Sequence, residues 1–159
     1  MDYTIRKAVA NDVDSIFRLI NELAIFENEP EAVIITPESL REDGFGAVPK
    51  FDCFIAESTE EVLGIALVYM RYSTWKGEVL HLEDLIVSEK ARGKGIGGAL
   101  LTEVIKFGND LGVKRIGWEV IDWNTPAIEF YEHIGANVMR DWHVVQLDEK
   151  GIENYLAKR

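Results

Sequence analysis

Cysteine is nearly absent from this chain, which has a single one, Cys53, among 159 residues. One cysteine excludes an intramolecular disulfide and a zinc site built from cysteines, and its place in an apolar stretch indicates an inert buried thiol. Long hydrophobic runs are also missing, since the longest fall far short of the roughly 20 residues that span a bilayer. The N-terminus lacks the basic start and apolar stretch of a secretory signal, so we expect a cytoplasmic protein.

Positive charge is scarce as well, because 17 Lys and Arg stand against 28 Asp and Glu, a formal net charge of −11. Nucleic-acid binding relies on basic groups that displace counterions from phosphates, so we expect no nucleic-acid partner. Anionic membrane surfaces are disfavoured for the same reason. The acidity suits a cationic partner, which the long-range field attracts, although it is more simply the ordinary acidity of a soluble protein.

The composition is otherwise ordinary for a globular protein, with 47% hydrophobic and 28% charged residues. A chain of this length can bury one sufficient core, so we predict a single domain over residues 1–159. Patterning and turn signals predict a mixed α/β (α+β) fold with helices on both faces of its sheet, in the order β-α-α-β-β-β-α-β-α-β. The predicted strands are Tyr3–Lys7, Phe51–Ser58, Val62–Tyr72, Val79–Val87, Arg115–Ile121 and Val144–Leu147. The predicted helices run from caps at Asn11 and Asp12 to about Glu27, from Thr36 to Gly44, from about Ala99 to Leu111 and from Thr125 to His133.

The strongest chemical signal is a glycine-rich loop at residues 92–98, between a predicted strand and a predicted helix. Glycines at alternate positions let the backbone turn tightly and point consecutive N–H groups outward, toward an anion at the helix N-terminus. Two cationic side chains in the loop add charge. We therefore predict a phosphate cradle made of Arg92, Gly93, Lys94, Gly95, Ile96, Gly97 and Gly98.

The surroundings of this loop limit the kind of phosphate ligand. Gly93, Gly95 and Gly98 match the dinucleotide pattern G-x-G-x-x-G, with Asp122 at the end of the next predicted strand. Five residues separate the preceding strand from Gly93, however, whereas a dinucleotide turn follows its strand at once, and too little chain follows Asp122 for a doubly wound sheet. A P-loop is excluded because no G-K-[S/T] follows the glycines. The pyrophosphate of coenzyme A remains as the candidate ligand of the loop.

Two motifs resemble those of a known family. The run Arg92–Gly97 resembles the acetyl-CoA signature R/Q-x-x-G-x-G/A of the GNAT N-acetyltransferases, and Asn124–Gly135 resembles their second cofactor motif, N-x-x-A-x-x-F-Y-x-x-x-G. Leu40–Gly46, Leu82–Asp84 and Asp122–Asn124 further resemble the diamine acetyltransferases, the spermidine/spermine and thialysine branch. The resemblance implies a twisted mixed sheet whose central parallel strands splay apart to admit acetyl-CoA. It also implies a homodimer, with direct acetyl transfer to a primary amine of a small cationic substrate.

The resemblance also implies catalytic roles. Glu83 matches the carboxylate that binds the amine and accepts its proton, directly or through water. Tyr131 matches the general acid that reprotonates the departing coenzyme A thiolate. Asp84, assigned to substrate binding, points to the opposite face of a regular strand from Glu83, so both carboxylates can serve the amine only if the strand is kinked or bulged.

Further matched residues would bind the two substrates. The backbone of Leu85, Ile86 and Val87 would pair with pantetheine as an added strand and polarise the acetyl carbonyl, and Asn124, Pro126 and Ala127 belong to the second cofactor motif. Glu27 would meet the far ammonium of the amine, with Phe26 and Trp142 also at the amine site. His81, His133 and His143 lack metal-ligand spacing, so we expect no metal.

Two departures from the polyamine enzymes leave the identity of the amine substrate open. Phe26 stands where those enzymes tend to carry tyrosine, and the segment from Gly135 to Trp142 is shorter, without its glutamate-rich stretch. Diamines, polyamines, thialysine and lysine-like amines all remain candidates. The alternatives are a GNAT enzyme for another amine, such as an aminoglycoside or an amino acid, and a non-catalytic sensor that binds acyl-CoA.

Overall fold

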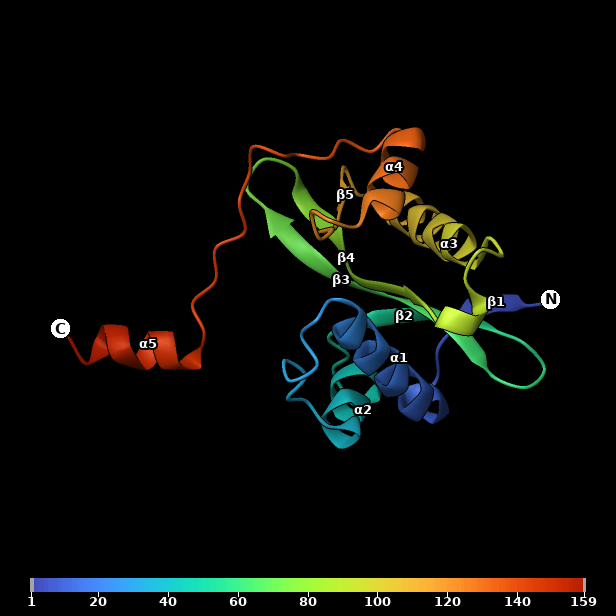
Figure 1. Ribbon diagram of the computed structural model, residues 1–159, viewed down its shortest axis with the longest axis horizontal. Helices are drawn as coiled ribbons and strands as arrows, with labels where there is room; N and C mark the ends of the chain where they lie inside the picture. The colour runs from blue at the N-terminus through green and yellow to red at the C-terminus, as the bar shows by residue number, and fades with distance from the viewer. Residues whose placement is uncertain (1, 159) are drawn as a thin grey trace. The chain divides into compact units, whose positions relative to one another are not determined.

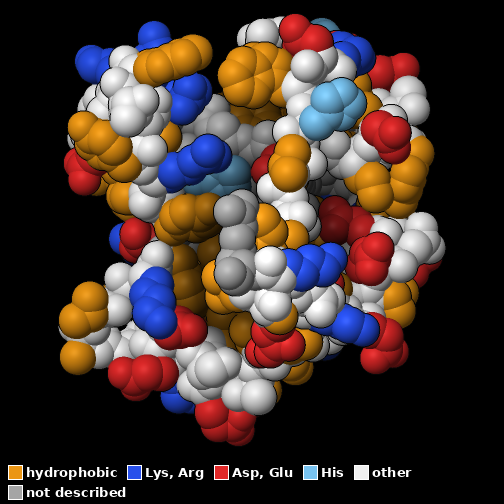
Figure 2. Space-filling view, turned by 90° about the vertical axis from the view of Figure 1, so that its left-hand side faces the viewer, with side chains coloured by type: hydrophobic (Ala, Val, Ile, Leu, Met, Phe, Trp, Pro, Cys, Tyr) orange, Lys and Arg blue, Asp and Glu red, His pale blue; other side chains and the backbone are white. Residues whose placement is uncertain are grey.

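The computed structural model describes residues 2–158. It divides into two compact units with a boundary between Glu119 and Val120. The sheet unit comprises the residues up to Glu119, and the C-terminal unit comprises those from Val120 on. No helix within residues 2–158 is long and apolar enough to cross a membrane. On the face shown in Figure 2, acidic, basic and hydrophobic side chains are interspersed.

The sheet unit contains a five-stranded sheet in the order β1-β2-β3-β4-β5 (Figure 1). Strands β1 to β4 are antiparallel to their neighbours, whereas β5 runs parallel to β4. The strand bounds are Thr4–Lys7 for β1, Asp52–Glu57 for β2, Val62–Ser73 for β3, Gly77–Val87 for β4 and Ile116–Gly117 for β5. The predicted strand Arg115–Ile121 is therefore much too long, since only two of its residues pair with β4.

Helices cover both faces of this sheet, as the sequence predicts (Figure 1). α1 (Val13–Phe26) and α2 (Pro37–Phe45) lie on one face, and α3 (Ile96–Asp110) lies on the other. Single 3₁₀ turns precede α1 and α3, at Ala10–Asp12 and Glu89–Ala91. α2 begins at the predicted cap, where Thr36 accepts a hydrogen bond from the Ser39 N–H at 3.1 Å.

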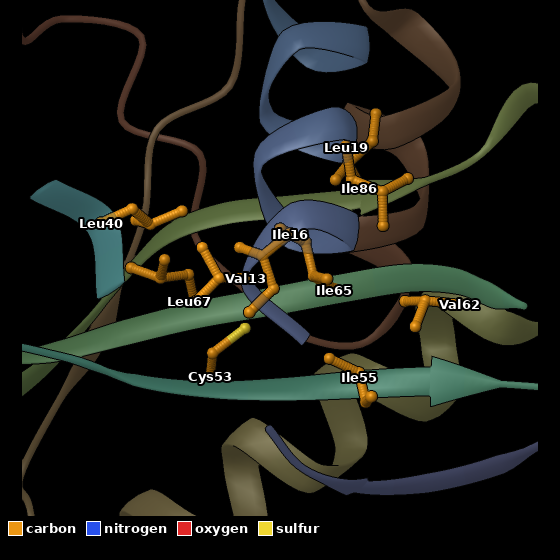
Figure 3. Packing of buried hydrophobic residues seen from close by; sticks show 10 residues of the cluster. All are labelled: Val13, Ile16, Leu19, Leu40, Cys53, Ile55, Val62, Ile65, Leu67 and Ile86. Carbon is orange, nitrogen blue, oxygen red and sulfur yellow. The ribbon is translucent and has the colours of Figure 1, made fainter. Parts of the chain in front are cut away.

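The core under α1 explains why the apolar stripe of this helix faces the sheet (Figure 3). Ten buried side chains from α1, α2 and strands β2, β3 and β4 pack together: Val13, Ile16, Leu19, Leu40, Cys53, Ile55, Val62, Ile65, Leu67 and Ile86. Each large aliphatic side chain buried in this way contributes about 1.5–3 kcal/mol. Burial also raises the pKa of the Cys53 thiol far above its ordinary value, which keeps the thiol protonated and unreactive.

An ion-pair network fixes the start of α1. The Arg6 guanidinium contacts Asp12 Oδ2 at 2.8 Å and Glu57 Oε2 at 2.7 Å, and so joins β1, the first 3₁₀ turn and β2. Asp12 also accepts a hydrogen bond from the Val9 N–H at 2.7 Å. Asp12 is therefore the N-cap residue of α1, as predicted, but its carboxylate makes no capping bond to this helix and binds Arg6 instead.

The C-terminal unit contains α4 (Thr125–His133), as predicted, and α5 (Glu149–Leu156), which the sequence did not predict. Asp148 caps α5, since its carboxylate accepts a hydrogen bond from the Gly151 N–H at 2.7 Å. The predicted strand Val144–Leu147 is wrong, because these residues form no ladder within the described chain. A β-branched run needs a partner strand to become a strand, and its composition alone does not supply one.

Candidate functional site

The parallel pairing at the edge of the sheet is very short. β5 pairs with β4 only at Leu80 and His81, while β4 continues to Val87. Within residues 2–158, the part of β4 beyond His81 is therefore paired on one side only, by β3. An unpaired strand edge presents backbone N–H and C=O groups that can bind an extended ligand. The backbone of Leu85, Ile86 and Val87 lies in this stretch, although the Val87 carbonyl already accepts a hydrogen bond from Arg92 Nε at 3.1 Å.

A β-bulge interrupts β4 where the predicted catalytic carboxylate stands. Leu82 pairs with Val68, and Asp84 pairs with the neighbouring Leu67, so that Glu83 is the additional residue. A bulge of this kind resets the alternation of side chains along the bulged strand. The structure thus meets the condition under which Glu83 and Asp84 can serve one substrate.

The register shows which face these side chains share. Leu67 belongs to the core under α1, and its partner Asp84 lies on the same face. Tyr69 follows two residues after Leu67, and its partner is His81, so this pair also lies on that face. Glu83 joins them, because its Oε2 lies 3.4 Å from Nε2 of His81.

Burial and mutual repulsion act on the carboxylates at this face. Burial raises the pKa of Asp84 to about 6, and the charges of Glu83 and Glu27 contribute in the same direction. Burial also raises the pKa of Glu27, which ends α1 as its C-cap. Three carboxyl groups from α1 and β4 therefore interact in one region, where a cation relieves their repulsion.

The glycine loop has the backbone conformation that the sequence predicts for an anion cradle. Gly93 and Gly95 have φ values of +75° and +77°, which side chains other than glycine rarely adopt. Gly95 is the N-cap of α3, so Ile96, Gly97 and Gly98 supply its first-turn N–H groups, which have no partner within the helix. A Cβ added at Gly97 meets only Val87 Cγ2, at 3.6 Å. Space beside the loop is therefore open, which leaves room for an anion such as a pyrophosphate.

Basic side chains flank this loop. The Arg92 guanidinium lies over the Phe26 ring, 4.9 Å from its centroid, and Lys94 Nζ donates to the Lys90 carbonyl at 3.2 Å. A cleft at the end of α1 is lined by Arg18, Glu22, Ile25, Phe26, Ser88, Glu89, Lys90 and Arg92. Phe26, which the sequence assigned to the amine site, thus also contacts the cradle arginine.

The C-terminal unit carries the remaining predicted site residues. Asn124 precedes α4, Pro126 and Ala127 lie in its first turn, and Tyr131 lies in its last turn, half-buried beside the Phe130 ring at 5.7 Å. Burial raises the pKa of Tyr131, which favours the protonated phenol. Trp142 lies in the irregular segment after α4 with 65% of its surface exposed.

Sequence reasoning missed two residues at this site, Tyr69 and His81. Their rings lie 5.1 Å apart between centroids, and both are grouped with Glu83 on the face under α1. The spacing of two residues between His81 and Glu83 on one strand was a usable signal, since such residues share a face. Tyr69 carried no local signal, because its position depends on the register between β3 and β4.

The sheet is thus mixed, its parallel pairing ends at His81, and a glycine loop leads into α3. Residues 13–136 match the acetyltransferase (GNAT) family. This chain belongs to that family and is an N-acetyltransferase. Among residues 2–158, no group of three or more His, Cys, Asp or Glu side chains is placed to hold a metal ion.

Relatives and solved structures agree with this assignment. The chain is 35% identical over 165 residues to the thialysine N-epsilon-acetyltransferase of Bos taurus, with 97% of each chain covered. It is also 35% identical to the human spermidine/spermine N(1)-acetyltransferase-like protein 1, covering 94% of this chain and 23% of that protein. An integron cassette protein from the mobile metagenome of V. cholerae has a similar structure, with a TM-score of 0.78, 25% identity and coverage of 100% and 99%.

Proposed function

We propose that this N-acetyltransferase transfers acetyl from acetyl-CoA to a primary amine of a small cationic substrate, namely a diamine, a polyamine or a thialysine-like amine. The observation that carries the proposal is the group of carboxyls of Glu27, Glu83 and Asp84 on the face under α1, close to the open edge of β4. An alkylammonium ion offsets the repulsion among these carboxylates, whereas an anionic substrate increases it. The similarity to thialysine and spermidine/spermine enzymes supports the same substrate class.

The cradle at residues 92–98 and the first turn of α3 are proposed to hold the pyrophosphate, with Arg92 and Lys94 as its cations. The edge of β4 at Leu85, Ile86 and Val87 is proposed to hold pantetheine, and Asn124, Pro126 and Ala127 to complete cofactor binding. When bound, acetyl-CoA supplies an acetyl group on a thioester. The N–H groups of the cradle compensate the charge of the phosphates without any rearrangement of the backbone.

Proton movements are assigned to two side chains. An ammonium group cannot attack a thioester until it loses a proton, and the Glu83 carboxylate is proposed to accept that proton, directly or through water. Asp84 and Glu27 hold the charge of the amine, with Phe26 and Trp142 proposed beside its methylenes. Tyr131 Oη is proposed as the proton donor to the leaving sulfur, a role supported by the raised pKa that keeps the phenol protonated.

The experiment is thiol release from acetyl-CoA with a panel of amines: spermidine, a short diamine, thialysine, lysine, an aminoglycoside and a neutral amine. Turnover of the small cationic amines with little turnover of the neutral amine supports the proposal. Turnover confined to the aminoglycoside supports the alternative enzyme. Tight acetyl-CoA binding without turnover of any amine supports an acyl-CoA sensor.

Variants at the two proton-transfer residues test the mechanism. Glu83→Gln keeps the side-chain shape but removes the proton acceptor, so kcat should fall by about 10²-fold or more, most severely at low pH. Tyr131→Phe removes one hydroxyl and should lower kcat on the same scale while acetyl-CoA still binds. If Tyr131→Phe retains more than about a tenth of kcat, another group or water protonates the thiolate.

We also propose that residues 1–159 form one acetyltransferase domain that assembles as a homodimer. The family match at residues 13–136 runs through the boundary between the two units, which supports one domain. The C-terminal unit exposes several apolar side chains, Val144, Val145, Leu147, Ile152 and Leu156, which supports a protein interface. Sedimentation of the wild type and of Val145→Asp tests the dimer. A cytoplasmic location stays a prediction from the sequence.

A further inference from the structure

A histidine and a tyrosine lie directly behind the proposed proton acceptor. His81 Nε2 is 3.4 Å from Glu83 Oε2, with 12% of the histidine side chain exposed against 53% of the glutamate side chain. The Tyr69 ring lies against His81 at 5.1 Å. Glu83 raises the pKa of the Tyr69 phenol through its charge and as a hydrogen-bond partner, after the larger effect of burial. The three side chains form one group, Tyr69–His81–Glu83.

The backbone holds this group at a fixed point of the sheet. His81 pairs with Tyr69 on β3 and with Gly117 on β5, so strands flank it on both sides. It is also the last β4 residue that β5 pairs, and the bulge at Glu83 follows two residues later. His81 is thus anchored where the pairing of β4 with β5 ends, while the Glu83 side chain at the bulge is about half exposed to solvent. An anchored partner beside a more exposed carboxylate is the arrangement that a proton relay needs.

We propose that His81 is a proton-relay residue that acts through Glu83, held in place by Tyr69, and this inference rests on the proposed role of Glu83 as the proton acceptor. A contact of 3.4 Å is longer than a good hydrogen bond. Such contacts in unliganded enzymes commonly shorten when substrate binds. Nε2 faces the carboxyl group, so once Glu83 has taken a proton its O–H can donate to the lone pair of Nε2 in a neutral ring whose proton is on Nδ1.

The relay accounts for the proton that leaves the ammonium group without a further reactant. The ammonium N–H bond breaks and its proton forms an O–H bond on Glu83. That O–H bond breaks in turn as the proton moves to Nε2 of His81, which becomes an imidazolium ion and leaves Glu83 as the carboxylate again. The imidazolium then gives one proton to water, which restores the neutral ring. Each cycle moves one proton from the amine to solvent and leaves both side chains unchanged.

Several other charges face this group, and they complicate a simple pH profile. Arg71 on β3 and Glu119 after β5 act on Tyr69 with opposite signs. Asp84 on β4 is repelled by Glu83 and by Glu27 at the end of α1. Because Asp84 itself titrates near pH 6, a change in the acid limb of activity cannot be assigned to His81 alone. Chemical rescue by imidazole is therefore the more specific measurement.

The experiment compares His81→Gln and His81→Ala with the wild type in the full-length protein. We expect kcat to fall about tenfold in both, which is less than the loss when a direct acid–base group is removed. The KM for the amine and the affinity for acetyl-CoA, measured by calorimetry, should change less than about twofold. Added imidazole should restore part of the kcat of His81→Ala in a saturable way. His133→Gln, on α4, is the matched control and should behave as the wild type.

Each outcome bears on one inference only. If His81→Gln and His81→Ala both keep more than half of kcat, or if imidazole fails to rescue a folded His81→Ala, the relay is wrong. If both variants lose acetyl-CoA affinity and thermal stability together, His81 is a structural residue, and the relay is again wrong. The proposed function fails separately, through a fully active Glu83→Gln or the absence of amine acetylation in the wild type. Tyr69→Phe should lower kcat by a smaller factor than His81→Gln, and imidazole should not restore it.

Discussion

The carboxyl groups of Glu83 and Asp84 lie on one face of the sheet, although the two residues are neighbours in the chain. A regular strand would direct them to opposite faces, and the bulge on β4 brings them together. Asp84 is the more buried of the two residues and has the raised pKa, whereas the Glu83 side chain is accessible to solvent. This pairing of a buried and an exposed carboxyl is what the proposed roles of Asp84 in amine binding and Glu83 in proton transfer require.

Asp84→Asn should stabilise the protein at neutral pH. The pKa of Asp84 rises from its ordinary value of 3.8 to about 6 on folding, so the folded state binds the proton more tightly and stability falls as pH rises between those values. A shift of this size lowers the free energy of unfolding of the wild type by about 2–3 kcal/mol at pH 8. Thermal unfolding of the variant and the wild type at pH 4 and pH 8 measures this difference in stability. An equal gain at both pH values would mean that the charge of Asp84 is not the cause.

Amine binding should depend on the same titration. A cationic amine favours the ionised form of Asp84, so binding should weaken as pH falls through about 6, the pKa that Asp84 has in the free protein. The KM for the best amine of the panel, measured from pH 5 to pH 8, should rise toward low pH. This rise should be much smaller in Asp84→Asn, whose KM should be high throughout. A KM profile that is identical in the two proteins would show that Asp84 does not bind the amine.

Salt should weaken turnover of a cationic amine more than turnover of a neutral amine. The attraction between an acidic surface and a cationic amine is screened over about 8–10 Å at ordinary ionic strength. The chain carries a net charge of −11, so kcat/KM for a diamine should fall as salt rises, whereas kcat/KM for a neutral amine should change little. Steady-state kinetics in increasing sodium chloride with both amines makes the comparison. An equal response would indicate a general salt effect on the enzyme.

The sequence predicted the parts of this fold that depend on local pattern. The stripe of Val13, Ile16 and Leu19 faces the core as its helical period requires, and the glycine loop leads into α3. α3 begins at Ile96 instead of near Ala99, because first-turn N–H groups need no helical partner and glycines are tolerated there.

The sequence pattern could not predict features that depend on pairing between strands. The bulge at Glu83 arises from a shift of register opposite Leu67 and Val68, and no residue in β4 marks it. β5 ends at Gly117 because pairing with β4 stops there, although the β-branched and apolar residues of the predicted strand continue. α5 was missed because Gly151 lowers its helical propensity, whereas its N-cap Asp148 compensates locally. The grouping of Tyr69 with Glu83 likewise follows from register.

Gly97→Ala provides the sharpest test of the cradle, because it separates stability from cofactor binding. Gly97 lies in the first turn of α3, and the added methyl meets only Val87 at 3.6 Å, an ordinary contact. Alanine in a helix is favoured over glycine by about 0.5–1 kcal/mol, so thermal stability should stay the same or rise. Acetyl-CoA affinity should nonetheless fall by about tenfold, since the methyl keeps the pyrophosphate away from the backbone N–H groups.

Calorimetry with acetyl-CoA and thermal unfolding together measure both effects of Gly97→Ala. Gly95→Ala and Gly112→Ala form a matched pair of controls, because both glycines have left-handed φ values, +77° and +72°, with open space beside them. Both variants should lose similar stability through backbone strain, about 1 kcal/mol. Only Gly95→Ala should also lose acetyl-CoA affinity, since Gly112 follows α3 at its far end. If Gly97→Ala binds acetyl-CoA as tightly as the wild type, the first turn of α3 does not hold the pyrophosphate.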